Sequence, residues 1–316
     1  MSRTVLCTPL RVEQAALRGA RHTLRLVHTG MGPRRAEAIA ARLATDPTPL
    51  LVAGLAATRT PQVRPGDVVV ATEVRPGLPP SAPRPPNSTA ELFIRPCGAL
   101  LLSSGGAERT GSRVEVPSAP LLAGALRRLG LIVHVGAITS VPRISWAPIA
   151  DGALAVDMES AQLATAGAPF AVVRAIVDTP DHPLWSLGTP RRGVRALRAL
   201  RACQPALEWW AAATGPREIL LAAPRSLRAI ASQVDLALVV GSPDSVPAAR
   251  RVGVPAHLVQ DVHEIDLRWL AGTTRLGIIA DASTPPRLVT RIVHCLGGLG
   301  PVHMTGCHRR ATREVV

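Results

Sequence analysis

Three acidic residues stand where they could take part in chemistry. Asp178, Glu159 and Glu13 each come at, or a few residues after, the end of an apolar run that is typical of a buried strand. The carboxyl ends of parallel strands form the ligand-binding edge of an α/β sheet. A partly buried carboxyl there has a raised pKa and suits a general acid, whereas an ionised one can hold hydroxyl groups or orient water.

These roles match the cleavage of a purine–ribose bond. That reaction forms an oxocarbenium-like sugar and an electron-rich leaving base. It needs an acid for purine N7, a carboxylate for the ribose hydroxyls, and water or phosphate as nucleophile. Asp178 suits the first role and Glu159 the second, while Glu13 could orient water. Each also has a structural explanation, Asp178 as a strand-end turn residue and the two glutamates as first-turn helix acids.

Strand-like and helix-like segments alternate over residues 1–213, which predicts an α/β fold with a mixed, mostly parallel sheet flanked by helices. Strands are expected at Val5–Cys7, Thr23–His28, Pro49–Leu55, Val68–Ala71, Leu131–Ile138, Gly152–Met158 and Phe170–Ile176. Helices are expected at Val12–Arg21, Pro33–Leu43, Leu121–Leu129, Glu159–Ala166 and Arg195–Ala213. The segments 75–88 and 179–192 are expected to be loops because they are rich in proline.

A break at 213–216 predicts a second, smaller α/β domain over 217–300, followed by a polar tail at 301–316 that we expect to be frayed from His303 on. Its expected strands are Glu218–Ala222, Leu236–Val240, Ala256–Val259 and Leu276–Ala280, and its expected helices are Arg225–Ser232 and Arg287–Leu296.

The net charge of +14 comes from arginine, which supplies all 36 basic residues. We expect no nucleic-acid partner, because the arginines are scattered and aromatic residues make up only 2% of the chain. No apolar stretch is long enough for a membrane span, and the N-terminus turns polar too soon for a secretory signal, so a cytoplasmic enzyme is expected. No metal site is expected, because the cysteines form no CxxC pair: they are Cys7, Cys97, Cys203, Cys295 and Cys307.

Taken together, the motifs of residues 1–213 resemble the methylthioadenosine/adenosylhomocysteine nucleosidase and purine nucleoside phosphorylase superfamily. The resemblance is carried by Glu13, Gly30-Met31-Gly32, Gly66-Asp67-Val68-Val69, Met158-Glu159-Ser160-Ala161 and Val173-Arg174-Ala175-Ile176-Val177-Asp178. It implies that Asp178 is the general acid, Glu159 the ribose ligand and Glu13 the water-positioning acid. Met158 would pack on the sugar, Gly30 and Gly32 would shape the nucleophile pocket, and Asp157 and Gly54 would also border the substrate.

Two positions depart from the family pattern and leave the nucleophile open. Val177 stands where the family often has serine, and the turn around Gly54 has few small hydroxyl residues. Glu13 favours water, but Arg11 or Arg34 could hold phosphate as a co-substrate. No other cofactor is expected. The resemblance also implies a homodimer that acts on a small-molecule nucleoside.

The segment 218–299 resembles the C-terminal third of hydroxymethylbutenyl diphosphate reductase, of the LytB family. Ser245 and Ser283 match hydroxyls that contact the diphosphate in that family. The family's iron–sulfur cluster is not expected here, because Arg228 occupies the place of a ligand cysteine. This segment is therefore expected to be a truncated remnant, either inert or used for docking or dimerisation.

The joining of a nucleoside-cleaving segment to an isoprenoid-pathway segment suggests a narrower function, the removal of adenine from adenosylhopane by a hopanoid-associated phosphorylase. Such an enzyme would associate peripherally with other hopanoid-pathway enzymes. Methylthioadenosine, adenosylhomocysteine and futalosine are alternative substrates. A reductase-related protein of isoprenoid biosynthesis and a non-catalytic scaffold are the alternative functions.

Overall fold

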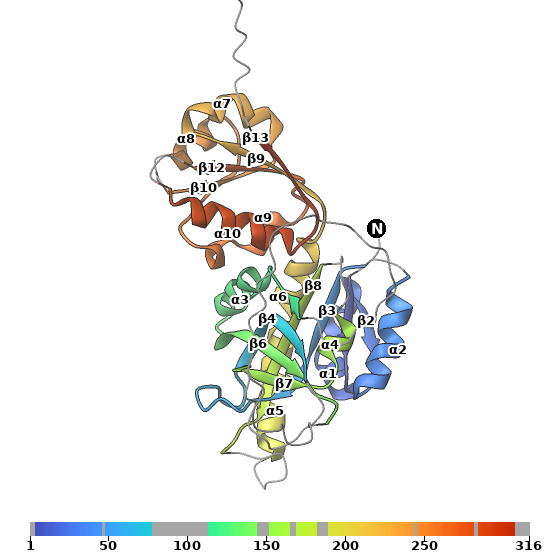
Figure 1. Ribbon diagram of the computed structural model, residues 1–316. Helices are drawn as coiled ribbons and strands as arrows, with labels where there is room; N and C mark the ends of the chain where they lie inside the picture. The colour runs from blue at the N-terminus through green and yellow to red at the C-terminus, as the bar shows by residue number, and fades with distance from the viewer. Residues whose placement is uncertain are drawn as a thin grey trace, which may run out of the picture.

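The computed structural model describes residues 4–45, 48–77, 113–143, 152–164, 169–181, 189–241, 243, 245–280 and 284–306. These residues form two sheets, each with helices packed against it, in two lobes (Figure 1). The α/β class and the second, smaller sheet are as the sequence predicts. Among the described residues, no helix is both long and apolar enough to cross a bilayer.

The first sheet has eight strands, with the order β2-β1-β3-β7-β6-β4-β5 and with β8 paired to both β3 and β4. The strands are β1 (Val5–Thr8), β2 (Arg25–His28), β3 (Leu50–Ala57), β4 (Val68–Pro76), β5 (Val114–Glu115), β6 (Val133–Ser140), β7 (Ala155–Asp157) and β8 (Phe170–Asp178). Most neighbours run parallel, whereas the pairs β3–β7, β4–β5 and β4–β8 are antiparallel. The central strands are buried along nearly their whole length, which explains their continuous apolar runs.

The helices of this lobe are α1 (Arg11–Ala16), α2 (Pro33–Leu43), α3 (Ala119–Arg128), α4 (Ser160–Leu163), α5 (Thr189–Ala202) and α6 (Gln204–Ala212). The prediction of one helix over 195–213 was wrong, because the chain begins a new helix after Cys203 with Pro205 in its first turn. The predicted helix 12–21 is also shorter, since a 3₁₀ turn (η1) takes over at Arg18–His22.

The second sheet is entirely parallel, with the order β11-β10-β12-β9-β13. Its strands are β9 (Arg217–Ala222), β10 (Leu236–Val240), β11 (Ala256–Val259), β12 (Arg275–Ala280) and β13 (Val302–Gly306). Its helices are α7 (Leu227–Ile230), α8 (Ser245–Arg251), α9 (Leu267–Leu270) and α10 (Pro286–Gly297). The predicted helix 225–232 is broken into 3₁₀ turns (η2, Pro224–Ser226, and η3, Ala231–Gln233) on either side of α7.

The expectation of a frayed tail from His303 was wrong for its first residues. His303 and its neighbours belong to β13, which pairs in parallel with Arg217–Leu221 of β9. This strand lies at the sheet edge and is largely exposed, so it has no apolar pattern that a sequence analysis could detect. Residues 307–316 lie outside the described part.

The two lobes share one hydrophobic core. Trp210 of α6 is fully buried between them, and its indole N–H donates to Ser118 Oγ at 3.1 Å. Leu267 and Leu270 of α9 belong to the same apolar cluster as α3 and α6. At Gly124 of α3 a Cβ atom would lie 2.1 Å from the carbonyl oxygen of His263, so glycine permits this close approach.

A buried arginine makes hydrogen bonds at the segment that connects the two lobes. Arg217, at the start of β9, is 3% exposed, and its guanidinium donates to the carbonyl oxygens of Ala213, Gly215 and Leu270. Burial lowers the pKa of Arg217 to about 10. These bonds join the end of α6 to the end of α9, so the connection is tied to both lobes.

Arg128 of α3 makes a further polar contact across the lobes, and its loss should lower the stability of the fold. Its guanidinium donates to the carbonyl oxygens of His263 and Ile265, both at 3.1 Å, and lies 3.7 Å from the Asp266 carboxylate. We expect Arg128→Ala to lower the free energy of unfolding by about 1–3 kcal/mol, because these acceptors lose their donor. Urea denaturation measures this, with Arg201→Ala at an exposed position of α5 as the control. Equal stability of the two variants would contradict the prediction.

Candidate active site

Three strands bring the predicted site residues to one end of the first sheet. β1 and β8 both pair with β3 in parallel, so their carboxyl ends lie together. In this register Gly54 of β3 lies opposite Arg174 of β8, and Ala57 lies opposite Asp178. The chain leaving β1 leads into α1, which carries Glu13. The topology thus gathers residues that are far apart in sequence.

Arg174 occupies the centre of this cluster. It is fully buried, and its Nε donates to Asp157 Oδ2 at 2.9 Å and its Nη2 to Ser160 Oγ at 3.0 Å. The same Nη2 lies 3.5 Å from Glu159 Oε2, while Nη1 has no hydrogen-bond partner among the described residues. A Cβ atom at Gly54 would lie 2.7 Å from Nη1 and 2.9 Å from Glu13 Oε1, so glycine leaves the space these two groups occupy. Gly54 is therefore next to the cluster.

Glu13 is buried, and both its carboxylate oxygens accept backbone N–H groups. Leu55 donates to Oε1 at 2.7 Å and Leu10 to Oε2 at 2.6 Å. The first of these bonds ties α1 to β3 and fixes the carboxylate in place. Burial raises the pKa of Glu13 to about 7, although both backbone donors and Arg174 favour the ionised form. A carboxylate oxygen accepts more than one hydrogen bond, so Glu13 can still bind a water proton.

The raised pKa of Glu13 makes stability depend on pH. The folded chain keeps this proton up to about pH 7, whereas the unfolded chain releases it near the ordinary value of 4.5. The stabilisation is therefore complete below pH 4.5 and is lost as pH rises through about 7, with a loss on the order of 3 kcal/mol. We expect Glu13→Gln to remove this decline between pH 4.5 and 8, measured by urea denaturation. The amide in the Glu13→Gln variant could lower stability by the same amount at every pH, which would not change the slope of stability against pH. A slope equal to that of the wild type would contradict the raised pKa of Glu13.

Glu159 is held at the junction of β7 and α4. The N–H of Gly32 donates to Oε1 at 3.0 Å and that of Met158 to Oε2 at 3.4 Å, and the residue is 4% exposed. Burial raises the pKa of Glu159, and the Arg174 guanidinium opposes this shift. A Cβ atom at Gly32 would lie 4.0 Å from Met158 Cε, so that methyl group also lies beside the turn.

The turn that holds Glu159 depends on glycine. Gly30 and Gly32, between β2 and α2, have φ angles of +75° and +94°, which favour glycine over other residues. The predicted residues Gly30, Gly32, Met158 and Glu159 thus lie on two segments joined by a backbone-to-carboxylate hydrogen bond.

Asp157 has a different environment from the one expected. It is 3% exposed, and its carboxylate accepts from Arg174 and from the hydroxyls of Ser140 and Ser160. Its Oδ1 also accepts the N–H groups of Glu159 and Ser160, both at 3.3 Å, so among the described residues each Asp157 oxygen has at least two donors, whereas each Glu13 oxygen has one. Asp157 is therefore better placed to position Arg174 than to contact a substrate.

Asp178 lies at the end of β8, four residues beyond Arg174. Four residues of strand span about 13 Å, which is comparable with the long dimension of a nucleoside. The residue is 2% exposed, and its Oδ1 has no hydrogen-bond partner among the described residues. Burial raises the pKa of Asp178, while Arg59, whose Nη1 lies 3.9 Å from Oδ2, and Arg192 oppose this shift. The carboxyl group is thus shielded from solvent, and its Oδ1 is the oxygen that could carry a proton toward a substrate.

No role was predicted for Arg174, although the acids are arranged around it. The sequence did contain one signal: Arg174 interrupts the apolar run 170–176, and an arginine in a buried strand is rarely found without a charged partner. The sequence could not identify its partners, which come from β7 and α4.

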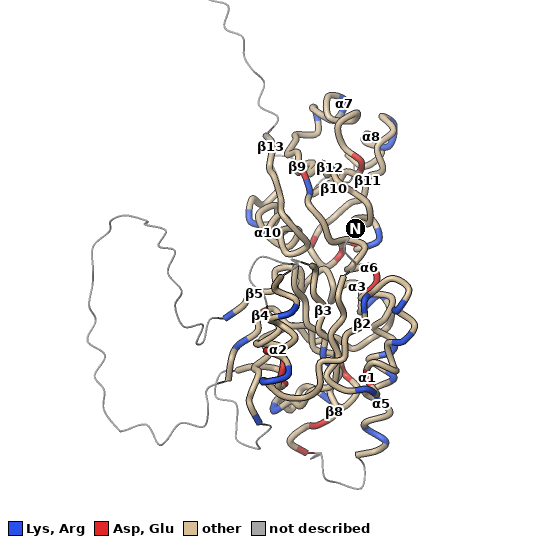
Figure 2. The backbone as a smooth tube through the Cα atoms, turned by 90° about the vertical axis from the view of Figure 1, so that its right-hand side faces the viewer, with Lys and Arg blue, Asp and Glu red and all other residues tan. Residues whose placement is uncertain are grey.

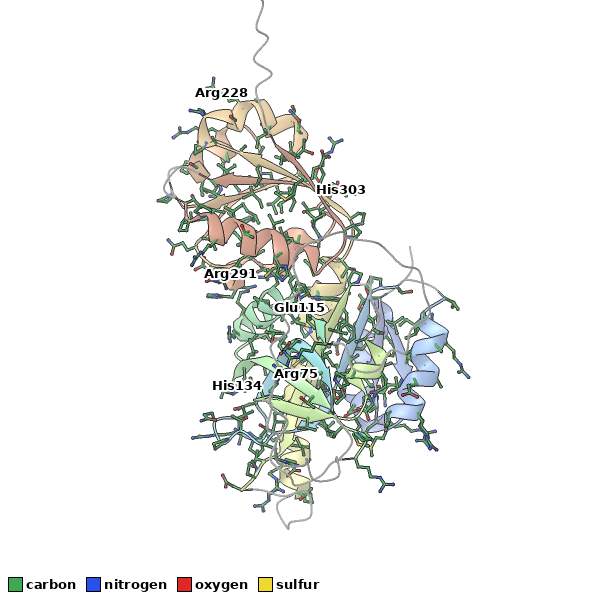
Figure 3. The ribbon with its side chains drawn as sticks, in the orientation of Figure 1. Arg75, Glu115, His134, Arg228, Arg291 and His303 are labelled. Carbon is green, nitrogen blue, oxygen red and sulfur yellow. The ribbon has the colours of Figure 1, made fainter. Side chains whose placement is uncertain are left out.

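The second lobe contributes fewer of the predicted site residues. Ser245 is buried at the start of α8, and Ser283 lies outside the described residues. Arg228 is exposed on α7, at the end of its lobe away from the first sheet (Figure 3). Of the three described cysteines only Cys295 belongs to this lobe, so the described residues do not provide three thiolates for an iron–sulfur cluster. Cys97 and Cys307 lie outside the described residues.

Residues 13–189, more than half of the chain, match the family model of the phosphorylase superfamily. The chain belongs to this superfamily. The matched region contains all four residues around which the site is built, Glu13, Glu159, Arg174 and Asp178. Residues 223–297 match the model of the LytB protein family, which supports the second resemblance.

Two curated relatives each match about a third of this phosphorylase-superfamily chain or less. The 4-hydroxy-3-methylbut-2-enyl diphosphate reductase of Marinobacter nauticus is 36% identical over 126 residues, which are 35% of this chain and 38% of that protein. The enzyme of the same name from Stenotrophomonas maltophilia is 42% identical over 81 residues, 24% of this chain and 26% of that protein. The chain thus spans about a quarter to two fifths of these relatives.

Among solved structures, two proteins of Helicobacter pylori are similar. The 5′-methylthioadenosine/S-adenosylhomocysteine nucleosidase has a TM-score of 0.48 and 14% identity, over 66% of this chain and 97% of that one. Futalosine hydrolase has a TM-score of 0.49 and 12% identity, over 65% of this chain and 97% of that one.

Proposed function

We propose that this protein hydrolyses the N-glycosidic bond of a purine nucleoside. The observation that carries the proposal is the pair of fixed, buried glutamates around Arg174, with Asp178 at the end of the same strand. The cluster provides carboxylates for water and for ribose hydroxyls, and Asp178 offers a buried acid. Membership of the phosphorylase superfamily supports the same class of reaction.

In this mechanism Asp178 gives its proton to N7 of the purine as the bond between N9 and C1′ breaks, so the base leaves neutral. Glu159 accepts hydrogen bonds from the ribose hydroxyls and stabilises the positive sugar. Glu13 accepts a proton from water as the water oxygen bonds to C1′. The products are the free base and the sugar, and the proton on Glu13 returns to Asp178 through solvent.

Water is the proposed nucleophile because of the charge around Arg174. Its guanidinium faces the carboxyl groups of Asp157, Glu159 and Glu13, which together offset its positive charge. A phosphate dianion would be repelled by the ionised carboxylates. Arg11 and Arg34, the other candidates for phosphate, are exposed on α1 and α2.

The substrate we propose carries an apolar 5′ substituent. Val12, next to Glu13, and Met31, next to Gly32, are 54% and 51% exposed, so an apolar side chain precedes each of these site residues at the surface. The LytB-family segment, whose relatives are named diphosphate reductases, supports an isoprenoid connection. Adenosylhopane combines a purine nucleoside with such a substituent and is the first candidate.

The deciding experiment measures purine release by the full-length protein from adenosylhopane or a short-chain analogue, methylthioadenosine, adenosylhomocysteine and futalosine, with and without phosphate. We expect release without phosphate and the highest kcat/KM for an apolar 5′ substituent. Release that requires phosphate would overturn the choice of water as nucleophile. No release from any substrate would overturn the proposed function.

A further inference from the structure

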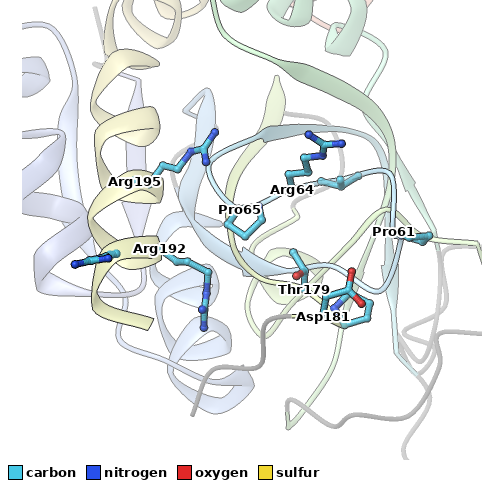
Figure 4. A pocket seen from close by; sticks show the side chains of 10 residues that line it. Pro61, Arg64, Pro65, Thr179, Asp181, Arg192 and Arg195 are labelled. Carbon is cyan, nitrogen blue, oxygen red and sulfur yellow. The ribbon is translucent and has the colours of Figure 1, made fainter. Parts of the chain in front are cut away.

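A pocket lies beyond the end of β8, next to the residue that follows Asp178. It has a volume of about 590 Å³ and is formed by the loop before β4, the residues after Asp178 and the first turns of α5 (Figure 4). The proposed reaction does not use this pocket. Its lining is strongly basic, with the four arginines Arg64, Arg191, Arg192 and Arg195 against one carboxylate, Asp181.

This concentration of charge is local. Arginines are spread over both lobes (Figure 2), but here four of them, from two separate segments, line one pocket. Arg192 and Arg195 are three residues apart on α5, and Arg191 and Arg195 are four apart, the spacings at which like charges on a helix repel each other. A bound anion would relieve this repulsion.

The segment that carries Arg64 is held firmly in place. In the turn 64–67, the N–H of Arg64 donates to the Asp67 carboxylate, and the N–H of Asp67 donates back to the Arg64 carbonyl oxygen, each at 3.0 Å. Asp67 also lies 3.0 Å from the His134 ring, so the turn is tied to β6. The Asp67 carboxylate thus bonds the backbone of Arg64, and the guanidinium extends to the pocket (Figure 4).

Arg195 lies in a space that glycine provides. Gly66 has a φ of +91°, and a Cβ atom there would lie 2.7 Å from both Cγ and Nε of Arg195. The same glycine lies in the turn that carries Arg64, so one backbone feature brings the two arginines, which come from different segments, to one pocket. Guanidinium groups gathered in this way suit the oxygens of phosphate groups, with which arginine forms paired hydrogen bonds.

We propose that this pocket binds a phosphate-class anion, a free diphosphate or a diphosphate ester, through Arg64 and Arg195. The mixed lining favours two phosphate groups over one, because four cations surround a volume larger than a single phosphate requires. The apolar side chains of Pro61, Val63 and Pro65 beside the arginines would also accommodate the carbon chain of an ester.

The test is equilibrium binding by isothermal titration calorimetry at constant ionic strength, with inorganic phosphate, inorganic diphosphate and dimethylallyl diphosphate as probes. The variant Arg64→Gln/Arg195→Gln removes two of the cations that line the pocket. The control Arg198→Gln/Arg201→Gln removes the same charge from exposed positions of α5 that do not line it. Thermal unfolding without ligand checks that both variants are folded.

We expect saturable diphosphate binding that the pocket variant weakens about tenfold or more and the control variant changes less than about twofold. Tighter binding of dimethylallyl diphosphate would identify an ester as the ligand, and equal binding would identify the free anion. Absence of saturable binding, or equal weakening in both variants, would overturn the proposal. Because the readout is binding, its result is independent of whether the protein cleaves nucleosides.

Discussion

Replacing Asp178 with asparagine is expected to lower kcat for purine release by about 10²–10⁴-fold. The carboxyl group is buried at the end of β8, and burial raises its pKa, so it can carry the proton that the leaving base needs. Asparagine has the same shape but cannot donate that proton as an acid. The loss should appear mainly in kcat, because the shape of the pocket is retained.

A matched control lies three residues further along the chain. Asp181 is exposed, and Asp181→Asn removes the same group near the same strand end. We expect this variant to keep kcat within about twofold, since exposed substitutions away from the reacting atoms have small effects. The far-ultraviolet circular dichroism of both variants should match the wild type. Full activity of Asp178→Asn would remove this residue from the mechanism.

Replacing Arg174 with methionine is expected to lower the free energy of unfolding by about 3–5 kcal/mol. Methionine fills part of the space but supplies no charge, so the Asp157 carboxylate, 2.6 Å from Arg174 Nη2, is left buried without its cation. Glu159 and Glu13 lose a favourable charge as well. Activity should fall too, because both glutamates adjoin the same guanidinium.

Urea denaturation at pH 8 measures this loss. The control is Arg275→Met, which breaks an exposed pair with Glu218 at 3.8 Å and should change stability by less than about 1 kcal/mol. At pH 5 the deficit of Arg174→Met should shrink, because the buried carboxylates left without a cation can take up protons. If Arg174→Met and Arg275→Met both lowered stability only slightly, burial would not be what makes the Arg174–Asp157 pair strong.

The class of fold and the order of its elements could be predicted from the amino-acid sequence. Periodic apolar runs gave both sheets and most of their strands, since a buried strand must be apolar whatever its neighbours are. Composition and motif spacing also indicated Glu13, Glu159 and Asp178, because a carboxylate after an apolar run is recognisable locally. The helix Pro33–Leu43 was predicted at its observed bounds, since Gly32 and Pro33 mark its start.

The contacts of these acidic residues could be known only from the folded chain. Asp157 and Glu159 are two positions apart and equally acidic in the sequence, yet Asp157 is enclosed by Arg174 and two serines, while Glu159 lies against the Gly32 turn. The polar strand β13, the shared core around Trp210 and the arginine pocket also depend on contacts between distant segments. Local sequence encodes burial and backbone preference. The partner of a charged side chain, and hence its role, depends on which strands the folded chain places side by side.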